Sequence, residues 1–336
     1  MNANVLIISN PEDIHTSAVV KQLHELGARY YLFYPERLTG DLMFTLVHRL
    51  IGGDPSCHLQ DGNTSIDLSH FNAVWYRRPR LVATPEDISA EGLEFARDEW
   101  RAALDSAYSL MSNTLWVSHP THLQEAARKP LQLRIARQVG LCTPKTLITN
   151  NADAARDFHK ACDGQVIVKP TGSGWVYAQD SEDVFCVMTN RITAEELRSD
   201  EQLRTAPVTF QEEVPKLYEL RVNIVGQQVL SIKIDSQSSS ISALDWRRYD
   251  IMNTPYTPYD LPKEVAAKCI LLTRRLGLEF GAIDLIRRPD GEYVFLEING
   301  NGQFLWAEQL SGVEVSNALA CLLAGISPPL SIRTLC

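Results

Sequence analysis

The segment 281–308, GAIDLIRRPDGEYVFLEINGNGQFLWAE, decides the fold of this chain. Residues 282–286 and 293–299 form two apolar runs in which side chains alternate as they do in β-strands. Between the runs, the Pro-Asp-Gly sequence at 289–291 is typical of a tight turn. The pattern predicts a β-hairpin with an acidic residue on each arm.

The polar residues of this hairpin form a candidate metal site. Asp284 lies in the first arm, and Glu297 and Asn299 are two residues apart on the second, so their side chains leave on one face. Two carboxylates and an amide oxygen are hard ligands, which suit Mg²⁺ when substrate phosphates fill its other positions. The alternative is a surface hairpin whose polar side faces water, but the apolar neighbours of both acids oppose it.

Composition excludes several classes of protein. The chain has 336 residues, enough for two or three packed units, and its net charge of −9 argues against general nucleic-acid binding. No apolar run approaches the length of a membrane span. The seven cysteines show no CxxC pair, which favours reduced thiols over a disulfide framework or a zinc site. We therefore expect a cytoplasmic protein without nucleic-acid or membrane partners.

The first third of the chain predicts a parallel sheet. A β-rich run at 5–9, a helical pattern ending at Gly27 and a strand at 30–34 form a βαβ unit. A further strand at 71–76 leads directly into Arg77-Arg78-Pro79-Arg80. Ligands bind at strand ends in such sheets, so these arginines could meet a phosphate or a carboxylate, or form a solvated loop.

Two lysines mark a candidate phosphate site in the middle of the chain. Lys129 lies within a predicted helix at 123–139, just before Pro130. Lys169 ends a predicted strand at 165–169 and precedes a glycine-containing loop, whose backbone N–H groups could approach phosphates closely. A P-loop is not indicated, because the lysine precedes the loop.

A second hairpin predicts a polar cleft. The strand at 219–225 places Glu219, Arg221 and Asn223 on one side, and the returning strand at 229–235 presents Lys233. We interpret this row as the wall of a cleft and not as a solvent face. The serine-rich segment that follows, 235–241, is expected to be mobile.

In combination, these features resemble those of the ATP-grasp ligases over most of the chain. The match consists of the strand, lysine and glycine loop, an acidic strand at 208–214, and an acidic hairpin ending in E-x-N. Two further segments, FNAVWYRRP at 71–79 and LDWRRYD at 244–250, are similar to the subgroup that macrocyclises ribosomal precursor peptides, the microviridin-type (graspetide) ligases. The resemblance implies an α/β and α+β architecture, the ATP-grasp fold behind an N-terminal pre-ATP-grasp parallel α/β domain. The expected domains are 1–115, 116–205 and 206–336.

The resemblance also implies roles for individual residues. ATP phosphates would be held by Lys129 and Lys169 under a lid formed by Gly172, Ser173 and Gly174. The adenine edge would meet the backbone of Gln211, Glu212, Glu213 and Val214, and the ribose would meet Glu219. The transferred phosphoryl group would face Arg221 and Lys233. Mg²⁺ would be bound by Asp284, Glu297 and Asn299.

The implied reaction is ATP-dependent ligation. Transfer of the γ-phosphoryl group to a carboxylate gives an acyl phosphate, which an amine or hydroxyl then attacks. In this subgroup the carboxylate belongs to Asp or Glu of a precursor peptide with a leader and an acidic core, and the product is an ω-ester or ω-amide. We assign the substrate carboxylates to Arg77, Arg78, Asp245 and Arg247, with Asp245 orienting its arginine, and expect a homodimer.

Three alternatives stay open. A RimK-like ligase would add a free amino acid to a carboxylate, and an ATP-grasp phosphotransferase would stop at a phosphorylated product. A nucleotide-binding module without turnover is opposed by the full set of charged groups. The sequence does not choose between ester and amide.

Overall fold

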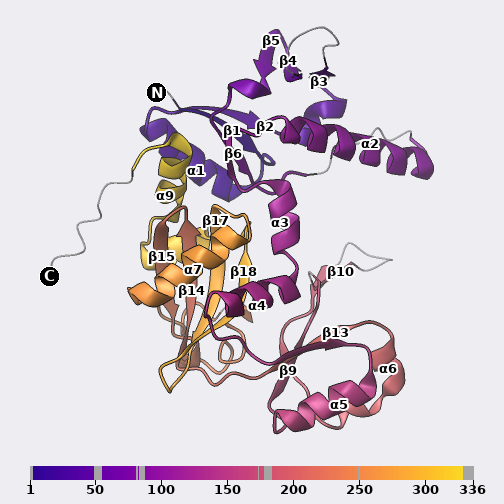
Figure 1. The fold of residues 1–336 in the computed structure, drawn as a ribbon, viewed down its shortest axis with the longest axis vertical. Helices are drawn as coiled ribbons and strands as arrows, with labels where there is room; N and C mark the ends of the chain where they lie inside the picture. The colour runs from indigo at the N-terminus through magenta and orange to yellow at the C-terminus, as the bar shows by residue number, and fades with distance from the viewer. Residues whose placement is uncertain are drawn as a thin grey trace, which may run out of the picture.

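The computed structural model describes residues 3–48, 55–80, 82, 88–172, 174–177, 184–248 and 250–327. Figure 1 shows the N-terminal part at the top, the C-terminal sheet below it and the central part at the bottom. The strands form separate sheets in these three parts of the chain.

The N-terminal part is built on a parallel sheet. Its elements are β1 (Asn4–Ile8), α1 (Ile14–Glu25), β2 (Arg29–Phe33), η1 (Pro35–Thr39), β3 (Leu42–Val47), β4 (Ser56–Asp61), β5 (Thr64–Asp67), η2 (Leu68–His70), β6 (Ala73–Tyr76), α2 (Ala90–Ser109) and β7 (Leu115–Val117). The strand order is β2-β1-β6-β7, and all of its pairings are parallel. The predicted parallel sheet is confirmed.

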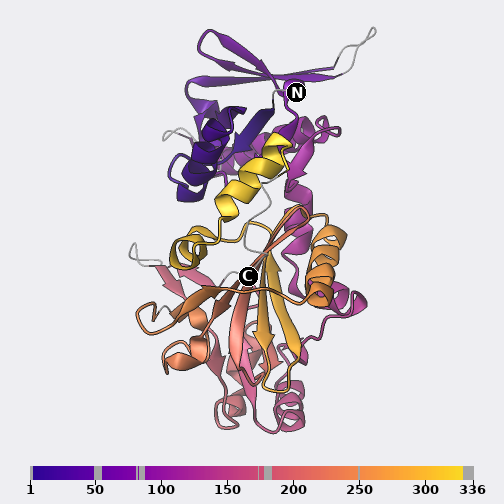
Figure 2. The same cartoon turned by 90° about the vertical axis from the view of Figure 1, so that its left-hand side faces the viewer.

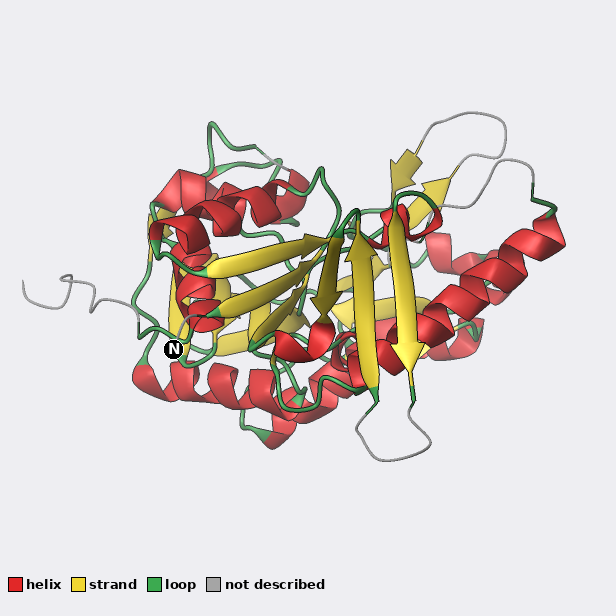
Figure 3. Ribbon diagram, turned by 90° about the horizontal axis from the view of Figure 1, so that it is seen from above, coloured by secondary structure: helices red, strands yellow, loops and turns green. Residues whose placement is uncertain are grey.

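A small antiparallel sheet, β3-β4-β5, was not predicted from the sequence. Its β3–β4 pair lies beside α2 (Figure 3), where the ring of Phe44 meets the edge of Trp100 at 5.9 Å. Leu42 of β3 and Leu59 of β4 join one buried cluster with Leu6 and Ile8 of β1, so this sheet covers one face of the parallel sheet.

The central part carries a four-stranded antiparallel sheet. Its elements are α3 (Pro120–Ala126), α4 (Lys129–Gln138), β8 (Thr146–Thr149), α5 (Ala152–Ala161), β9 (Val166–Lys169), β10 (Trp175–Tyr177), β11 (Val184–Cys186), β12 (Asn190–Arg191), η3 (Glu196–Arg198), α6 (Asp200–Arg204) and β13 (Val208–Glu212). The order is β12-β9-β13-β8, and β10 pairs with β11 in a separate hairpin.

The predicted helix at 123–139 is wrong as a single helix. The structure divides it into α3 and α4, with Arg128 in extended conformation between them. Pro130 explains the break, because proline has no N–H to donate inside a continuous helix and clashes with the carbonyl four residues earlier, whereas it fits the first turn of a new helix. Lys129 therefore begins α4 and does not lie inside a longer helix.

The C-terminal part contains the predicted hairpins in one five-stranded sheet. Its elements are β14 (Tyr218–Val225), β15 (Gln228–Ile234), η4 (Ser236–Ser238), η5 (Trp246–Arg248), β16 (Tyr256–Pro258), α7 (Lys263–Arg275), β17 (Phe280–Arg287), β18 (Tyr293–Asn299), α8 (Leu305–Ser311) and α9 (Val315–Ala324). The order is β16-β15-β14-β17-β18. On one face Leu220, Ile283 and Leu285 pack with apolar residues of α4 and α7. The opposite face is left for the cleft described below.

The N-terminal and C-terminal parts share a core. Helix α9 lies between the parallel sheet and the C-terminal sheet (Figure 2). Val19 and Leu23 of α1 are in the same buried cluster as Leu319 of α9 and Phe280 of β17. Each fully buried side chain of this size contributes about 2 kcal/mol, so the contact holds the two parts together. Among the described helices, none is both long and apolar enough to cross a lipid bilayer.

Candidate active site

A cleft of about 600 Å³ lies between the central and C-terminal sheets. Its charged lining residues come from distant parts of the chain. The cations are Arg78, Lys129, Lys169, Lys216, Arg221 and Arg247, and the acids are Glu212, Glu213, Glu219, Asp245, Asp284 and Glu297. The structure thus brings together most of the residues that the sequence analysis singled out.

The register of the β17–β18 hairpin directs its acids into this cleft. Asp284 lies opposite Glu297, and Ala282 lies opposite Asn299. A β-bulge next to Asp284 makes both Leu296 and Glu297 line the cleft. Asp284, Glu297 and Asn299 therefore share one face: spacing predicted this for Glu297 and Asn299, and the bulge brings Asp284 opposite Glu297.

Glu297 is surrounded by cations. Its Oε2 lies 3.3 Å from Nζ of Lys129, and its Oε1 lies 3.8 Å from Nη1 of Arg247. Burial acts to raise the pKa of Glu297, but the charges of Lys129, Lys169 and Arg247 outweigh it and lower the pKa to about 2. The carboxylate is therefore ionised at any neutral pH.

Lys169 reaches the same region from the end of β9. Its Nζ donates a hydrogen bond to Oε1 of Gln211 at 3.0 Å. Burial lowers the pKa of Lys169 to about 8, because an ammonium group loses hydration inside the cleft. A bound anion would restore the charged form.

Arg221 and Asp284 form a buried pair on the cleft face of the sheet. Nη1 of Arg221 donates to Oδ1 of Asp284 at 2.8 Å. The guanidinium carbon lies 5.5 Å from the ring centre of Trp246 and 5.7 Å from that of Trp306. Burial raises the pKa of Asp284 despite the neighbouring arginine. Aromatic rings and an ion pair thus fix the direction of Arg221.

The oxygen ligands of the hairpin fit a magnesium ion. Asp284 and Glu297 are paired across the two strands, with Asn299 on the same face. Within the described ranges, His, Cys, Asp and Glu form no group of three or more that could hold a metal alone. Two carboxylates and an amide leave positions for phosphate oxygens, which is how Mg²⁺ is bound beside nucleotides.

The loop at 244–248 forms another wall of the cleft. Arg247 donates to both oxygens of Asp245, from Nε at 2.9 Å and from Nη2 at 2.7 Å. Burial acts to raise the pKa of Asp245, but these bonds lower it overall. Nη2 of Arg248 donates to the carbonyl of Thr189 at 2.8 Å. This loop therefore touches the central part of the chain.

The serine-rich segment before this loop is not an unanchored chain. Ser236, Ser239 and Ser242 are buried. Ser242 Oγ donates to the carbonyl of Ser236 at 2.9 Å, and Ser239 bonds Asp250. Serine hydroxyls readily form such bonds with nearby backbone groups, and the expectation of a mobile segment considered only the serine content.

One end of the cleft is apolar and adjoins a buried acid. Val214, Ile286, Val294 and Leu296 form a small cluster there. Close by, Glu219 is buried and accepts a hydrogen bond from Nζ of Lys216 at 2.9 Å. An apolar slot beside a carboxylate has the character needed for a planar base and a polar sugar.

Glu212, the last residue of β13, and Glu213, which follows it, both have side chains bonded within the central part. Oε1 of Glu212 accepts from the backbone N of Lys145, and Glu213 pairs with Arg191 at 2.6 Å. Their side chains are thus engaged, while Gln211, Glu212, Glu213 and Val214 all line the cleft. This arrangement is compatible with the backbone role that the resemblance implies.

Lys233 does not belong to the cleft, contrary to the prediction. It lies opposite Leu220, whereas the neighbouring Ile232 lies opposite Arg221. Because side chains alternate along a strand, Lys233 is on the face away from Arg221. Its Nζ is 3.6 Å from Oδ2 of Asp235 and 4.8 Å from the ring centre of Tyr218. The charge of Lys233 suggested a cleft, but strand parity decides its direction.

Arg77 also differs from its predicted place. It is 1% exposed and does not line the cleft, whereas Arg78 does. A side chain buried to this extent cannot receive a substrate carboxylate. Both arginines donate to the carbonyl of Asn301, Arg77 from Nη1 at 2.6 Å and Arg78 from Nη2 at 2.9 Å, but only Arg78 lines the cleft.

The glycine loop is described only in part. Gly172 lines the cleft and Gly174 does not. Ser173 lies outside the described residues.

Sequence reasoning missed several residues that line the cleft: Lys216, Thr189, Gln303 and Trp306. The spacing of Lys216 and Glu219 is a weak local signal for their ion pair. Trp306 follows the E-x-N sequence closely and could have been included with it. The position of Thr189 depends on how the chain folds over the cleft, and no local signal points to it.

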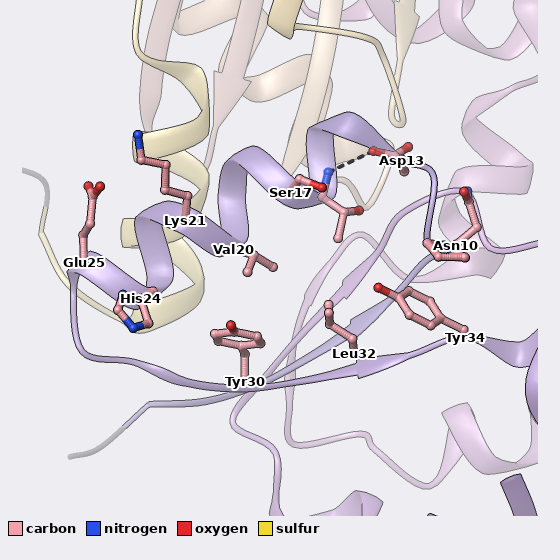
Figure 4. A pocket seen from close by; sticks show the side chains of 12 residues that line it. Asn10, Asp13, Ser17, Val20, Lys21, His24, Glu25, Tyr30, Leu32 and Tyr34 are labelled. Atoms are coloured by element: carbon pink, nitrogen blue, oxygen red, sulfur yellow. Dashed lines mark hydrogen bonds between the residues drawn. The ribbon is translucent and has the colours of Figure 1, made fainter. Parts of the chain in front are cut away.

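A second cavity, of about 510 Å³, lies on the N-terminal part between α1 and β2 (Figure 4). Tyr30, Leu32 and Tyr34 of the strand side face Val20 and His24 of α1. Unlike the cleft, it does not combine several cations with paired carboxylates, so we place the chemistry in the cleft.

Comparisons with known proteins agree with this geometry. The family model described as the MvdD pre-ATP grasp domain matches residues 4–124. The macrocyclase MdnC of Microcystis aeruginosa MRC, solved with precursor peptide MdnA, is 31% identical, with 96% of this chain and 99% of that chain covered and a TM-score of 0.83. A comparison with curated protein sequences found no match.

Two further solved structures are similar over their whole length. A RiPP-associated ATP-grasp ligase of Chryseobacterium gregarium, solved with ADP and a leader and core peptide, is 27% identical, with 97% of this chain and 98% of that chain covered and a TM-score of 0.87. The macrocyclase MdnB of Microcystis aeruginosa MRC is 29% identical, with 96% and 99% covered and a TM-score of 0.77. The predicted ATP-grasp fold is confirmed, and this chain is an enzyme that belongs to the family of ATP-grasp ligases that macrocyclise precursor peptides.

Proposed function

We propose that this enzyme uses ATP and Mg²⁺ to activate Asp or Glu side chains of a ribosomal precursor peptide and closes ester or amide rings between side chains. The observation that carries the proposal is the convergence of Lys129, Lys169 and Arg247 on Glu297 in one cleft. Such a cation-rich site with paired carboxylates suits a nucleotide polyphosphate and its metal. Glu297 would then bind the metal, and the cations around it would bind the phosphates.

Different residues around the cleft would bind the phosphates, the adenine and the ribose of the nucleotide. Lys129 and Lys169 would bind the phosphates, and Gly172 would let the backbone approach them. The apolar slot at Val214 and Leu296 would take the adenine, with backbone groups of Gln211, Glu212 and Glu213 at its edge. Glu219 would accept hydrogen bonds from the ribose, held in place by Lys216.

Asp284, Glu297 and Asn299 would hold Mg²⁺, which when bound neutralises phosphate charge during phosphoryl transfer. Arg221, held by Asp284 and two tryptophans, would face the transferred group. Because Arg221 is already oriented, it stabilises developing charge without reorganising first.

Arg247 and Arg78 would bind the substrate carboxylate. The guanidinium of Arg247 is fixed by Asp245 and lies near Glu297, so a carboxylate bound there sits beside the phosphates. The contacts of Arg247 and Arg248 with Thr189 close this side of the cleft. Closure keeps water from an acyl phosphate, which would otherwise hydrolyse before the amine or hydroxyl attacks.

Mass spectrometry of the peptide product tests the proposal. The enzyme is incubated with ATP, Mg²⁺ and a short peptide encoded beside its gene that carries Ser, Thr or Lys together with Asp or Glu. We expect the loss of one water per ring together with release of ADP and phosphate, and no loss with Glu297→Gln. Glu292→Gln, on the exposed turn of the same hairpin, is the matched control and should retain activity.

The other outcomes identify the alternatives. A gain of one amino-acid residue would indicate a RimK-like ligase, and a gain of phosphate would indicate a phosphotransferase. Treatment with mild alkali distinguishes the two ring types, because an ester hydrolyses and regains the mass of one water, whereas an amide does not.

Partners and location remain proposals of the same kind. A precursor peptide with a leader and an acidic core would bind along the cleft, where Arg78 and Arg247 supply positive charge. The homodimer, the cytoplasmic location and the lack of nucleic-acid or membrane partners stay predictions from the sequence.

A further inference from the structure

Arg77 lies at the boundary between the N-terminal part and the C-terminal sheet. Its Nη1 donates to the carbonyl of Asn301 at 2.6 Å and lies 3.4 Å from that of Gly302. Its Nε is 3.3 Å from Oδ2 of Asp13. A buried cation from the N-terminal part thus contacts two carbonyl groups of the turn that follows β18.

Two elements of the N-terminal part hold Arg77: α1 through the guanidinium and β1 through the backbone. Asp13 caps α1, since its Oδ1 accepts from the backbone N of Thr16 at 2.9 Å (Figure 4). The backbone N of Arg77 donates to the carbonyl of Ile8, the last residue of β1, at 2.7 Å. Sheet and helix therefore fix both the backbone and the charge partner of Arg77.

The turn at 299–303 carries two groups of the cleft. Oδ1 of Asn299 accepts from the backbone N of Asn301 at 3.0 Å, which links the side chain of Asn299 to the turn. The carbonyl of Gln303 accepts from Nη2 of Arg221 at 3.3 Å. A displaced turn would move both Asn299 and the partner of Arg221.

We propose that Arg77 is a positioning residue that holds the turn at 299–303, and through it Asn299 and Arg221, from the N-terminal part. Its planar fork can serve neighbouring carbonyls, while a lysine retains the charge without that geometry. The catalytic part of this role of Arg77 rests on the proposed function, since Asn299 can be a metal ligand only if this cleft binds a metal. The mechanical role of Arg77 does not depend on it.

The experiment compares Arg77→Met and Arg77→Lys with the matched control Arg37→Met. Arg37 also lies in the N-terminal part and pairs with two acids, Asp41 and Asp61, but does not line the cleft. Three quantities are measured on each protein: the melting temperature, hydrogen exchange of the amides of 299–303 without ligand, and the Mn²⁺ concentration needed for half-maximal ADP binding.

We expect Arg77→Met to speed exchange at the amides of Asn301 and Gly302 about tenfold and to raise the Mn²⁺ requirement by a similar factor. Arg77→Lys should give intermediate values, and Arg37→Met should lower only the melting temperature. A folded Arg77→Met protein with parental exchange would overturn the proposal, as would equal changes in Arg37→Met. If Arg77→Met does not fold, the comparison of Arg77→Lys with Arg37→Met decides by the same criteria.

The failure of the proposed function would look different. Mn²⁺-dependent ADP binding that is unchanged in Glu297→Gln would remove the metal from this hairpin. The exchange of the 299–303 amides, measured without nucleotide or metal, would still show whether Arg77 holds the turn.

Discussion

At the scale of single residues, burial and strand parity decide which charges can act. Glu297 and Asn299 could be predicted to share a face from their spacing, whereas the position of Asp284 opposite Glu297 depends on the β-bulge between the two strands. The direction of Lys233 could not be predicted, since the face it occupies depends on the register between β14 and β15. Arg77 and Arg78 are adjacent in sequence, yet one is buried and the other lines the cleft. Sequence shows which charges exist, and packing determines where they point.

The lowered pKa of Lys169 predicts how nucleotide affinity changes with pH. Burial places this pKa at about 8, so the ammonium form that attracts phosphates is lost as the pH rises through that value. We expect ADP affinity to be level below about pH 7 and to fall toward ~tenfold per pH unit well above pH 8. Calorimetric titration with ADP at several pH values measures this directly.

Lys169→Arg is the control for this pH dependence. A guanidinium stays charged throughout the range, so its affinity profile should be flat even if its absolute affinity is lower. A parental profile with no decline above pH 8, or the same decline in Lys169→Arg, would assign the effect to another group.

At the scale of elements, the hairpins were predictable from the sequence, and the break between two helices was less so. The β17–β18 hairpin appears where its pattern placed it, because alternating apolar residues and a turn sequence are local signals. The division between α3 and α4 depends on Pro130, and the apolar periodicity on both sides of this proline suggests one continuous helix. The strands of the β3-β4-β5 sheet have 6, 6 and 4 residues, against 8 and 7 in the β17–β18 hairpin, and the place of that sheet depends on packing beside α2.

The turn after β18 has no room for a side chain at Gly302. A Cβ there would collide with Cβ of Ala282 and lie 3.3 Å from the carbonyl of Asn299. We expect Gly302→Ala to lower the free energy of unfolding by about 1–3 kcal/mol, the usual cost of overpacking, and to weaken metal-dependent ADP binding. Denaturant unfolding and ADP titration on the same protein test both effects.

Ser65→Ala, at an exposed position of β5, provides the comparison for Gly302→Ala. This change removes one hydroxyl from the surface and adds no atom to a packed site. The stability of Ser65→Ala should stay within about 0.5 kcal/mol of the parent. Equal stabilities of the Gly302→Ala protein and the parent would mean that the turn adapts, and that its position is not tightly determined.

At the scale of the whole molecule, the cleft is assembled from all three parts of the chain. The N-terminal part supplies Arg78, the central part Lys169 and the C-terminal part Glu297. The division into 1–115, 116–205 and 206–336 remains a proposal, and two strands bear on it. β7 spans the first boundary and extends the N-terminal sheet, while β13 lies beyond the second and pairs with β9. Sequence order cannot show such exchanges, because strand partners are chosen in three dimensions.

Substitution of Arg247 tests whether this cleft binds the carboxylate of the peptide substrate. It joins the C-terminal loop to Thr189 of the central part and lies near Glu297, so it can align a substrate carboxylate with the phosphates. We expect Arg247→Ala to abolish ring formation while ADP affinity changes less than about threefold, and Asp245→Ala to act more mildly.

Melting temperature, ADP affinity and peptide mass are measured on one preparation, with Arg248→Ala as the neighbouring control. Arg248 bonds the same part of the chain but does not line the cleft, so its loss should slow ring formation without abolishing it. If Arg247→Ala loses all three properties together, the arginine is structural; if it loses none, the peptide carboxylate binds elsewhere.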